Sequence, residues 1–395
     1  MKINVYKLLL IALLMHFLIV GCTRNDSLAG TQSTHISSAI NEAAQAKLTF
    51  KGLGIRYAQN FKIDYLNDSV KLIADSDGNK LLLVPKGIMI PPGYDDAVLV
   101  ETPIANVMYN STTYVGLLGA LENDSLFESV AIVTTAENEW TIPQILNGFR
   151  NGTTHFIQHG MTGIGNIEEI IKMKPTFVFT GGMDAIEMQL RNLLDEIGIK
   201  HATILEYTEE GDSAYLEWIK FFAAFYNLDE EADRIFEEKM SHLNEFYAKT
   251  AQVANRPTVA YGQISNGMIY TQSGTSTLSK QIEKAGGIYA LNGLEGNGTV
   301  IISMEEFFNK CRNADIIIYG STPKYCPDKA FLLETDPLIG EFAAFKNDAI
   351  YIFDQGYYMN SGKVVEKFED LVSIIQPDLL PGHSLIMYQK LPDKS

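Results

Sequence analysis

Residues 213–251 read SAYLEWIKFFAAFYNLDEEADRIFEEKMSHLNEFYAKTA, and this stretch decides how the chain is organised. Its apolar residues recur every three or four positions, the spacing of an amphipathic helix, and no strand pattern interrupts them. We expect Asp229 to cap the second half, with Glu230 and Glu231 favourable in the first turn. The roughly 22 residues from Asp229 onward would form about 33 Å of helix, enough to cross two lobes. The repeating apolar positions are Leu216, Ile219, Phe222, Tyr226, Ala232, Ile235, Phe236, Leu243 and Phe246.

Both flanks of this helical stretch alternate apolar runs of strand length with helical patterns. Such alternation is typical of a parallel sheet covered by helices. We therefore predict an α/β protein with two lobes, each with a mainly parallel sheet flanked by helices, joined by a long rigid interlobe helix within 213–251. The first lobe covers 48–212 and begins with a β-hairpin in 50–84, and the second covers 252–395. The predicted strands are 97–100, 129–134, 177–180, 201–205, 258–261, 314–319 and 349–353, and the predicted helices include 111–121, 184–197 and 276–285.

The amino-terminal residues have the pattern of a targeting signal. Lys2 and Lys7 precede an apolar run, Leu8–Val20, that is too short to span a bilayer, which takes about 20 residues. Residues 1–21 are therefore predicted to be a cleaved signal peptide. The polar stretch 22–47, rich in Ser, Thr, Asn, Gln and Ala, is predicted to be a flexible tether.

The residues at the end of the predicted signal, Leu18–Cys22, resemble the lipobox of bacterial lipoproteins. In such proteins a diacylglycerol is attached to the cysteine thiol, and the chain is cleaved just before it. The resemblance implies lipid attachment at Cys22 and an extracytoplasmic position on a bacterial membrane, in the periplasm or at the cell surface. An ordinary secretory signal with a coincidental cysteine is the alternative.

The composition narrows the range of partners. The chain has 31 Lys and Arg residues against 48 Asp and Glu residues, a formal net charge of -17, which disfavours nucleic acid and anionic lipid as electrostatic partners. Besides Cys22 there are only Cys311 and Cys326, too few for a zinc or iron–sulfur ligand set. In an oxidising compartment these two could form a disulfide, and two unpaired thiols are the alternative.

Two segments, 166–179 and 303–318, share one plan of helix cap, short helix and strand. Each begins with a good N-cap residue and has a Glu three residues later, as in a capping box. The second helical position also carries a Glu in both segments, Glu168 and Glu305, and these side chains should point into solvent. They either stabilise the helix dipole or serve a function. The caps are Asn166 and Ser303, and their expected partners are Glu169 and Glu306.

These paired segments resemble the motifs of the iron-siderophore, haem and cobalamin substrate-binding proteins of ABC importers. In that family one Glu on each lobe docks into Arg pockets of a dimeric permease that an ATPase drives. The resemblance implies that Glu168 and Glu305 dock a monomeric binding protein onto such a permease. It also implies that a metal chelate is bound between two α/β lobes and that no cofactor is present apart from this ligand. The chain departs from the motif at Thr176, where Asp is usual, and at Asn313-Ala314, which replaces a Pro-containing turn.

Ligands of open parallel sheets bind beyond the carboxyl ends of strands. The loops predicted there carry aromatic and hydroxyl side chains, which suit planar or conjugated ligands. His159 or Tyr270 is also able to ligate iron, with loop and packing roles as the simpler alternatives. Trp140 is the strongest candidate because it follows Glu139 in a polar loop, whereas the second Trp of the chain, Trp218, is expected to pack. The predicted ligand-binding residues are Ser111, Thr112, Trp140, His159, Met183, Tyr270, Gln272, Tyr357 and Tyr358.

These features favour a lipoprotein that captures an iron complex, either a ferric siderophore or haem, for an ABC importer. Capture of a corrinoid for the same type of importer is the second hypothesis. The third is a surface hemophore or adhesin that works without a transporter. An enzyme is not expected, because the sequence shows no nucleophile–base–acid set, no Walker-type phosphate loop and no cysteine cluster.

Overall fold

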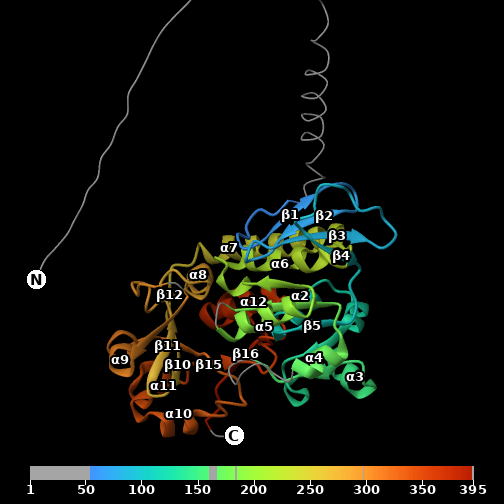
Figure 1. The fold of residues 1–395 in the computed structure, drawn as a ribbon. Helices are drawn as coiled ribbons and strands as arrows, with labels where there is room; N and C mark the ends of the chain where they lie inside the picture. Colours follow the sequence, from blue (N-terminus) through green and yellow to red (C-terminus); the bar gives the residue numbers. More distant parts are fainter. Residues whose placement is uncertain (1–53, 160–166, 183–184, 297, 394–395) are drawn as a thin grey trace, which may run out of the picture. The chain divides into compact units, whose positions relative to one another are not determined.

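The computed structural model describes residues 54–159, 167–182, 185–296 and 298–393, which all belong to one compact unit, Leu48–Ser395 (Figure 1). The predicted signal peptide and tether, with Cys22, lie outside the described residues, as do Asn166 and Met183. The described chain forms one wholly parallel sheet and one mixed sheet, both flanked by helices, together with a smaller sheet near its beginning. The predicted α/β fold class is confirmed.

The first lobe is built on a wholly parallel sheet of five strands in the order β7-β6-β5-β8-β9. Every residue of the inner strand β8 is buried, as expected when helices cover both faces of a sheet. The strands are β5 (Val107–Tyr109), β6 (Val130–Val133), β7 (His155–Phe156), β8 (Phe177–Gly181) and β9 (His201–Ile204). The helices are α2 (Thr112–Gly119), α3 (Pro143–Asn151), α4 (Ile167–Met173) and α5 (Ala185–Glu196), with 3-10 turns η1 (Asp124–Ser129), η2 (Glu137–Glu139) and η3 (Glu206–Thr208).

The second lobe has a mixed sheet in the order β13-β11-β10-β14-β15-β16, with β12 also paired to β10. Strands β12, β10, β14 and β15 run parallel, whereas β11, β13 and β16 pair antiparallel. The strands are β10 (Thr258–Ser265), β11 (Met268–Gln272), β12 (Ile288–Tyr289), β13 (Thr299–Ser303), β14 (Ile316–Tyr319), β15 (Ile350–Phe353) and β16 (Tyr388–Lys390). The helices are α8 (Thr277–Lys284), α9 (Met304–Cys311), α10 (Lys329–Thr335), α11 (Ala343–Lys346) and α12 (Val364–Ile375), with 3-10 turns η4 (Pro337–Glu341) and η5 (Pro377–Leu379).

The helical stretch between the lobes forms two helices, α6 (Asp212–Ala224) and α7 (Asp229–Thr250). The predicted 22-residue length of the second is confirmed, but the predicted cap is wrong. Leu228 occupies the cap position without a side-chain hydrogen bond, and Asp229 lies in the first turn. The Asp229 carboxylate instead accepts a 2.6 Å hydrogen bond from Lys71 Nζ. The side chain that was expected to cap the helix therefore forms an ion pair with the leading part of the chain.

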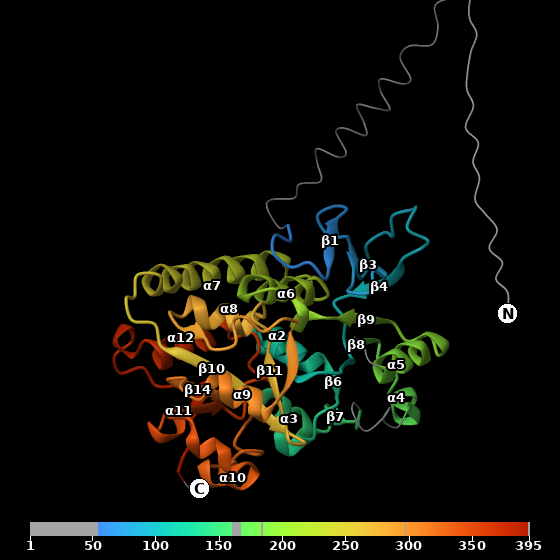
Figure 2. The same cartoon turned by 90° about the vertical axis from the view of Figure 1, so that its left-hand side faces the viewer.

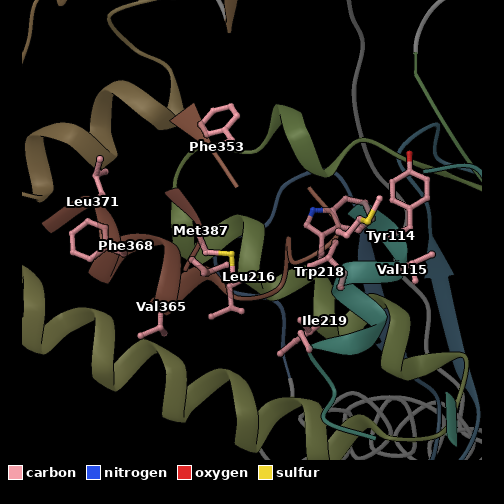
Figure 3. Close-up of a cluster of buried hydrophobic side chains, with 14 of the residues drawn as sticks. Tyr114, Val115, Leu216, Trp218, Ile219, Phe353, Val365, Phe368, Leu371 and Met387 are labelled. Atoms are coloured by element: carbon pink, nitrogen blue, oxygen red, sulfur yellow. The ribbon is translucent and has the colours of Figure 1, made fainter. Parts of the chain in front are cut away.

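Helix α6 is buried along almost its whole length because residues of both lobes pack around it. Figure 3 shows Leu216, Trp218 and Ile219 of α6 within the cluster that joins the two lobes. Trp218 is 0% exposed, which confirms its predicted packing role. The surrounding side chains labelled in Figure 3 are Tyr114 and Val115 of α2, and Phe353, Val365, Phe368, Leu371 and Met387 of the second lobe.

The chain begins with a separate four-stranded sheet, which we call the leading sheet. A hairpin was predicted here, and the strands are β1 (Lys62–Tyr65), β2 (Lys71–Ala74), β3 (Lys80–Pro85) and β4 (Val98–Thr102). Strands β1 to β3 are antiparallel, but β4 pairs parallel to β3. The predicted strand 97–100 was therefore assigned to the wrong sheet. The first-lobe sheet uses β5, which is only three residues long and has no sequence pattern of its own.

Candidate ligand-binding site

Three polar side chains stand where strands of the first-lobe sheet end. Asn110 follows β5 directly, His159 comes three residues after β7, and Glu206 comes two residues after β9. The carboxyl ends of parallel strands meet at one edge of a sheet, and this is the edge at which open α/β sheets bind ligands. The first lobe therefore brings an amide, an imidazole and a carboxyl group to its ligand-binding edge.

Glu187 of α5 connects Asn110 to His159. Asn110 Nδ2 donates to the two carboxylate oxygens of Glu187 at 2.6 and 2.8 Å, and His159 Nε2 lies 3.0 Å from Glu187 Oε1. Because a carboxylate only accepts, the neutral His159 ring carries its proton on Nε2 and leaves a lone pair on Nδ1. The His159 side chain is 1% exposed. Carboxylate–histidine pairs of this kind orient imidazoles that bind metal centres.

Glu206 belongs to a second hydrogen-bonded group at the start of α2. Thr113 Oγ1 donates to Glu206 Oε1 at 2.6 Å, and Ser111, the N-cap of α2, lies 2.8 Å away from Thr113 Oγ1 through its hydroxyl. Glu206 is 2% exposed. Burial raises the pKa of Glu206 to about 7, against the opposing effect of the Thr113 hydrogen bond. Near neutral pH this carboxyl group is therefore able to accept or to donate a hydrogen bond.

Several buried polar atoms at these strand ends have no hydrogen-bond partner among the described residues. Folded proteins pair the great majority of their buried polar atoms, so a group of unpaired ones needs an explanation. Four of the seven such atoms follow strands of the two lobe sheets, and a ligand or water bound there would satisfy them. These four are Asn110 Oδ1, His159 Nδ1, Glu206 Oε2 and, after β14 in the second lobe, Thr322 Oγ1.

The second lobe contributes an aromatic group after β15. Tyr357 stacks on Phe353 with ring centroids 4.0 Å apart, and its hydroxyl lies 3.2 Å from that of Tyr388. Lys367 Nζ lies 4.1 Å from the centroid of the Tyr357 ring. Tyr357 is thus held by packing, whereas the neighbouring Tyr358 is 48% exposed and offers a free aromatic surface.

The loops that follow the strands also join the two lobes. Lys324 Nζ, after β14, lies 3.1 Å from Glu139 Oε1, after β6. The backbone N–H of Thr141 lies 3.3 Å from the Met359 sulfur, at hydrogen-bond distance for that atom. The two lobes therefore contact each other directly through loops that follow strands of both sheets.

A groove with a volume of about 480 Å³ lies between α2, α7 and the segment after β15. Its lining includes Gly116, Thr141, Lys239, Asp354 and Asn360. Small-molecule sites usually have volumes of 300 to 1,000 Å³. None of the four residues with unpaired atoms lines this groove, so the groove and the strand-end cluster are separate features. We place the candidate site at the strand-end cluster, because polar groups capable of recognition converge there.

Three predicted ligand contacts differ from their expected setting. Trp140 is 5% exposed and its Nε1 donates to the Thr135 carbonyl at 3.0 Å, so it packs in the core instead of presenting its ring. Tyr270 and Gln272 lie within strand β11, not in a loop after a strand. Gln272 Nε2 donates to Thr299 Oγ1 at 3.1 Å on the neighbouring strand β13. The alternating pattern of an antiparallel hairpin was mistaken here for a strand end.

Cys311 and Cys326 are both buried and unpaired, so the disulfide considered as one alternative is not formed. Of the remaining predicted contacts, Ser111 caps α2 and Thr112 is its first residue, half-buried beside Thr113. Among the described residues, no group of three His, Cys, Asp or Glu side chains is placed to hold a metal ion. No described helix is long and apolar enough to cross a membrane.

The two predicted docking carboxylates lie in the first turns of their helices. Glu168 is in α4 and Glu305 is in α9, and both side chains are exposed. In α9 the Ser303 hydroxyl accepts from the Glu306 N–H at 3.1 Å, which confirms Ser303 as the predicted N-cap. Glu305 takes no part in this cap, and its exposed side chain is accessible to solvent or to a partner.

Sequence reasoning missed Asn110, Glu187 and Glu206 as members of the candidate site. Glu206 comes directly after the predicted strand 201–205, so the rule that selected the other residues would have selected it too. No sequence signal pointed to Glu187, because it lies six residues beyond β8 and reaches the site from helix α5.

The chain is similar in sequence to a known family of binding proteins. The profile of a family described as periplasmic binding protein matches residues 111–357, more than half of the chain. An uncharacterized lipoprotein of Methanocaldococcus jannaschii is 26% identical over 359 residues, which cover 85% of each chain.

Solved structures with the same fold include two extracytoplasmic binding proteins. A periplasmic solute binding protein from Veillonella parvula has a TM-score of 0.56 at 17% identity, covering 80% of this chain and 89% of that one. A periplasmic heme binding protein from Pseudomonas aeruginosa has a TM-score of 0.56 at 13% identity, covering 74% of this chain and 98% of that one. At these identities the likeness shows a shared fold.

Proposed function

Because the chain belongs to the periplasmic binding protein family, we propose that it captures an iron complex outside the cytoplasm and delivers it to an ABC permease dimer and its ATPase. The ligand would be a ferric siderophore or haem, held between the two lobes. The observation that carries this proposal is the set of buried, unpaired polar atoms where the strands of both lobes end. The shared fold with a heme binding protein supports the same class of ligand.

His159 is the residue through which such a ligand would be held most directly. Its Nδ1 lone pair is fixed by the Glu187 contact at Nε2, and imidazole nitrogen is a common axial ligand of iron chelates. Tyr358 would cover a flat ligand from the second lobe, since its ring is exposed and aromatic faces stack on conjugated rings. Glu206, with its pKa near 7, would bind a polar group at the ligand rim.

A corrinoid is the second candidate ligand, and the unpaired acceptors favour it. Asn110 Oδ1 and Glu206 Oε2 have no hydrogen-bond partner among the described residues, and a ligand with carboxamide groups at its rim would bring N–H donors to such atoms. An axial position on its metal would also be open to His159. Haem, by contrast, presents carboxylates, which would need Glu206 in its protonated form.

A thermal-shift panel tests the ligand class. Haem, a ferric catecholate, a ferric hydroxamate and cyanocobalamin would each be added to the purified protein, since a ligand at 100 times its dissociation constant stabilises by about 2.7 kcal/mol. One panel member should raise the melting temperature, and His159→Ala should reduce that rise. His155→Ala is the matched control, because His155 is exposed at β7. If no panel member stabilises the protein, the proposed ligand class is wrong.

Docking to a permease is proposed to use Glu168 and Glu305, one on each lobe. The double charge reversal Glu168→Lys with Glu305→Lys should abolish ligand uptake by cells and leave ligand affinity unchanged. Glu128→Lys with Glu295→Lys is the control, because it also reverses one exposed Glu on each lobe. Uptake that survives the first pair would favour the third hypothesis, a surface hemophore or adhesin without a transporter.

Attachment through a lipid at Cys22 completes the proposal. The related Methanocaldococcus jannaschii protein is named a lipoprotein, which supports the lipobox resemblance. Cys22→Ser should release the protein from the membrane fraction of the cell while ligand binding by the purified protein stays unchanged. Retention of the variant in that fraction would contradict the anchor.

A further inference from the structure

The loop between β3 and β4 carries three consecutive exposed aliphatic side chains. Residues 87–93 read GIMIPPG, and Ile88, Met89 and Ile90 are 46%, 88% and 52% exposed. The flanking Gly87 and Gly93 both have positive φ, which turns the chain sharply on either side of the apolar tip. No charged or hydrogen-bonding side chain lies within these seven residues.

The base of this loop is packed, but its tip is not. Tyr94 and Ala97 pack against Leu82 and Val84 of the leading sheet, which orders the return of the chain into β4. The three tip residues join none of the hydrophobic clusters of the described chain. Contiguous exposed apolar side chains of this kind mark surfaces that bind a partner or a membrane.

We propose that the apolar tip, residues 88–90, inserts into the lipid surface to which Cys22 anchors the chain. This inference rests on the proposed lipid anchor. A tip of three aliphatic side chains without polar groups suits the acyl region of a bilayer, whereas a protein partner would normally be recognised through aromatic or charged groups as well. The described chain also begins, at Gly54, only eight residues before β1 of the same sheet.

Because the anchor would keep the tip near the bilayer, a weak affinity of the tip for lipid is enough for insertion. Thirty-one residues separate Cys22 from Gly54, and a chain of that length reaches at most about 100 Å. The tip is therefore kept within a small volume above the bilayer, where its effective concentration is high. Insertion through aliphatic groups needs no anionic lipid, and the net charge of -17 would oppose approach to an anionic surface.

Insertion would also orient the candidate site. In Figures 1 and 2 the leading sheet lies at the top of the molecule, whereas α4 and α9, the helices that carry Glu168 and Glu305, lie in its lower half. With the tip in lipid, the two helices that carry the docking carboxylates would lie in the part of the body away from the membrane. The inserted form is thus a capture orientation, which the protein leaves in order to dock. A folded body of this size is about 50 Å across, so the reach of the tether allows both orientations.

A fluorophore at the tip tests insertion. Met89→Cys in the full lipidated chain would be labelled with an environment-sensitive dye and reconstituted into phosphatidylcholine vesicles. The label goes to the new thiol, because Cys22 carries the lipid and Cys311 and Cys326 are buried. Met188→Cys on α5 is the matched control, since Met188 is also an exposed methionine, at 50%.

The dye at position 89 should show a blue-shifted emission in vesicles and be quenched by brominated lipid, and the dye at position 188 should show neither change. Adding Ile88→Ser and Ile90→Ser should abolish the shift at position 89 without lowering the melting temperature. An aqueous emission at position 89 in vesicles would overturn the proposal. A shift that needs the permease, or that appears without vesicles as the protein self-associates, would overturn it as well.

Discussion

The hydroxyl of Ser361 donates a 2.6 Å hydrogen bond to the backbone carbonyl of Thr113, which bonds the segment after β15 to the first turn of α2 in the other lobe. The Thr113 side chain at the same time donates to Glu206. One residue therefore belongs both to the junction between the lobes and to the candidate ligand site. A change in the packing of the lobes should therefore shift Thr113 and its hydrogen bond to Glu206. A ligand bound at Glu206 should in turn affect the contact between Thr113 and Ser361.

Gly116→Ala is expected to push the lobes apart at this junction. A Cβ at Gly116 would lie 2.4 Å from Ser361 Oγ and 2.6 Å from the Met359 carbonyl oxygen, distances that real structures do not tolerate. Overpacking of this kind costs typically about 1 to 3 kcal/mol. Urea unfolding should show that loss of stability, and small-angle X-ray scattering should show a larger radius of gyration. Gly293→Ala is the control, because a Cβ there meets nothing within 4 Å; equal effects of the two changes would refute the explanation.

Glu206→Gln is expected to flatten the pH dependence of stability. Burial raises the pKa of the carboxyl from 4.5 to about 7, so between these values the folded protein keeps a proton that the unfolded chain has released. The free energy of unfolding must therefore fall as the pH rises through this range, by about 3 kcal/mol from this group, with the loss complete above pH 7. Gln does not titrate, so the free energy of unfolding of the variant should rise relative to that of the wild type between pH 5 and pH 8.

Urea unfolding at several pH values checks this prediction. Glu210→Gln is the control, since Glu210 is an exposed neighbour that pairs with Lys280 at the surface. Parallel stability curves for the wild type and Glu206→Gln would show that the buried carboxyl does not titrate in this range.

Asp370→Asn is expected to loosen the carboxyl-terminal segment. Asp370 is 0% exposed, and one of its oxygens accepts the backbone N–H groups of Ile386, Met387 and Tyr388 at 2.6 to 3.1 Å. The other oxygen lies 2.6 Å from His383 Nε2. An amide offers one acceptor where the carboxylate offers two, so buried donors would be left unpaired at a cost of about 3 kcal/mol.

Chemical denaturation and hydrogen exchange measure this effect. The amides of 386–388 should exchange faster in Asp370→Asn, and the midpoint of unfolding should fall. Asp378→Asn changes an exposed residue shortly after the same helix and should leave both unchanged. Normal protection of 386–388 in the Asp370 variant would contradict the role assigned to the carboxylate.

The regular parts of this fold were predictable because their patterns are local. Helix α7 has the 22 residues that the sequence indicated, although Asp229 lies in its first turn instead of capping it, and Ser303 caps α9 as predicted. What sequence patterns missed depends on pairing between distant segments. Strand β4 looks like any other apolar run, and only its partner β3 decides to which sheet it belongs.

The candidate site was predictable only in outline. The rule that ligands bind after parallel strands led to Ser111 and His159, but a local pattern does not tell a strand end from the turn of a hairpin, which misplaced Tyr270. Trp140 was favoured because it follows Glu139 in a polar loop, yet a Trp in a loop can turn inward when a backbone carbonyl such as that of Thr135 accepts its N–H. Glu187 was out of reach, because its role arises from α5 folding back over the sheet edge.

Glu217→Gln is expected to free the beginning of the described chain from α6. The Glu217 carboxylate is 0% exposed and accepts the backbone N–H groups of Arg56, Tyr57 and Ala58 at 2.7 to 3.0 Å. Hydrogen bonds to a buried charged group contribute about 1.5 to 3 kcal/mol each. Glu217→Gln should therefore lower the stability of this segment more than a substitution of an exposed residue does. These hydrogen bonds form a clamp that holds residues 56–58 on α6. Its loss should let residues 56–58 detach while the two lobes remain folded.

Hydrogen exchange separates this clamp from a surface contact on the same segment. In Glu217→Gln the amides of 56–58 should lose protection, while those of β8 in the core keep theirs. Glu237→Gln is the matched control, because Glu237 pairs with the side chain of Arg56 at the surface, and such exposed ion pairs contribute at most about 1 kcal/mol. Equal deprotection in both variants would mean that the surface pair holds the segment; unchanged protection in Glu217→Gln would mean that the buried carboxylate does not hold it.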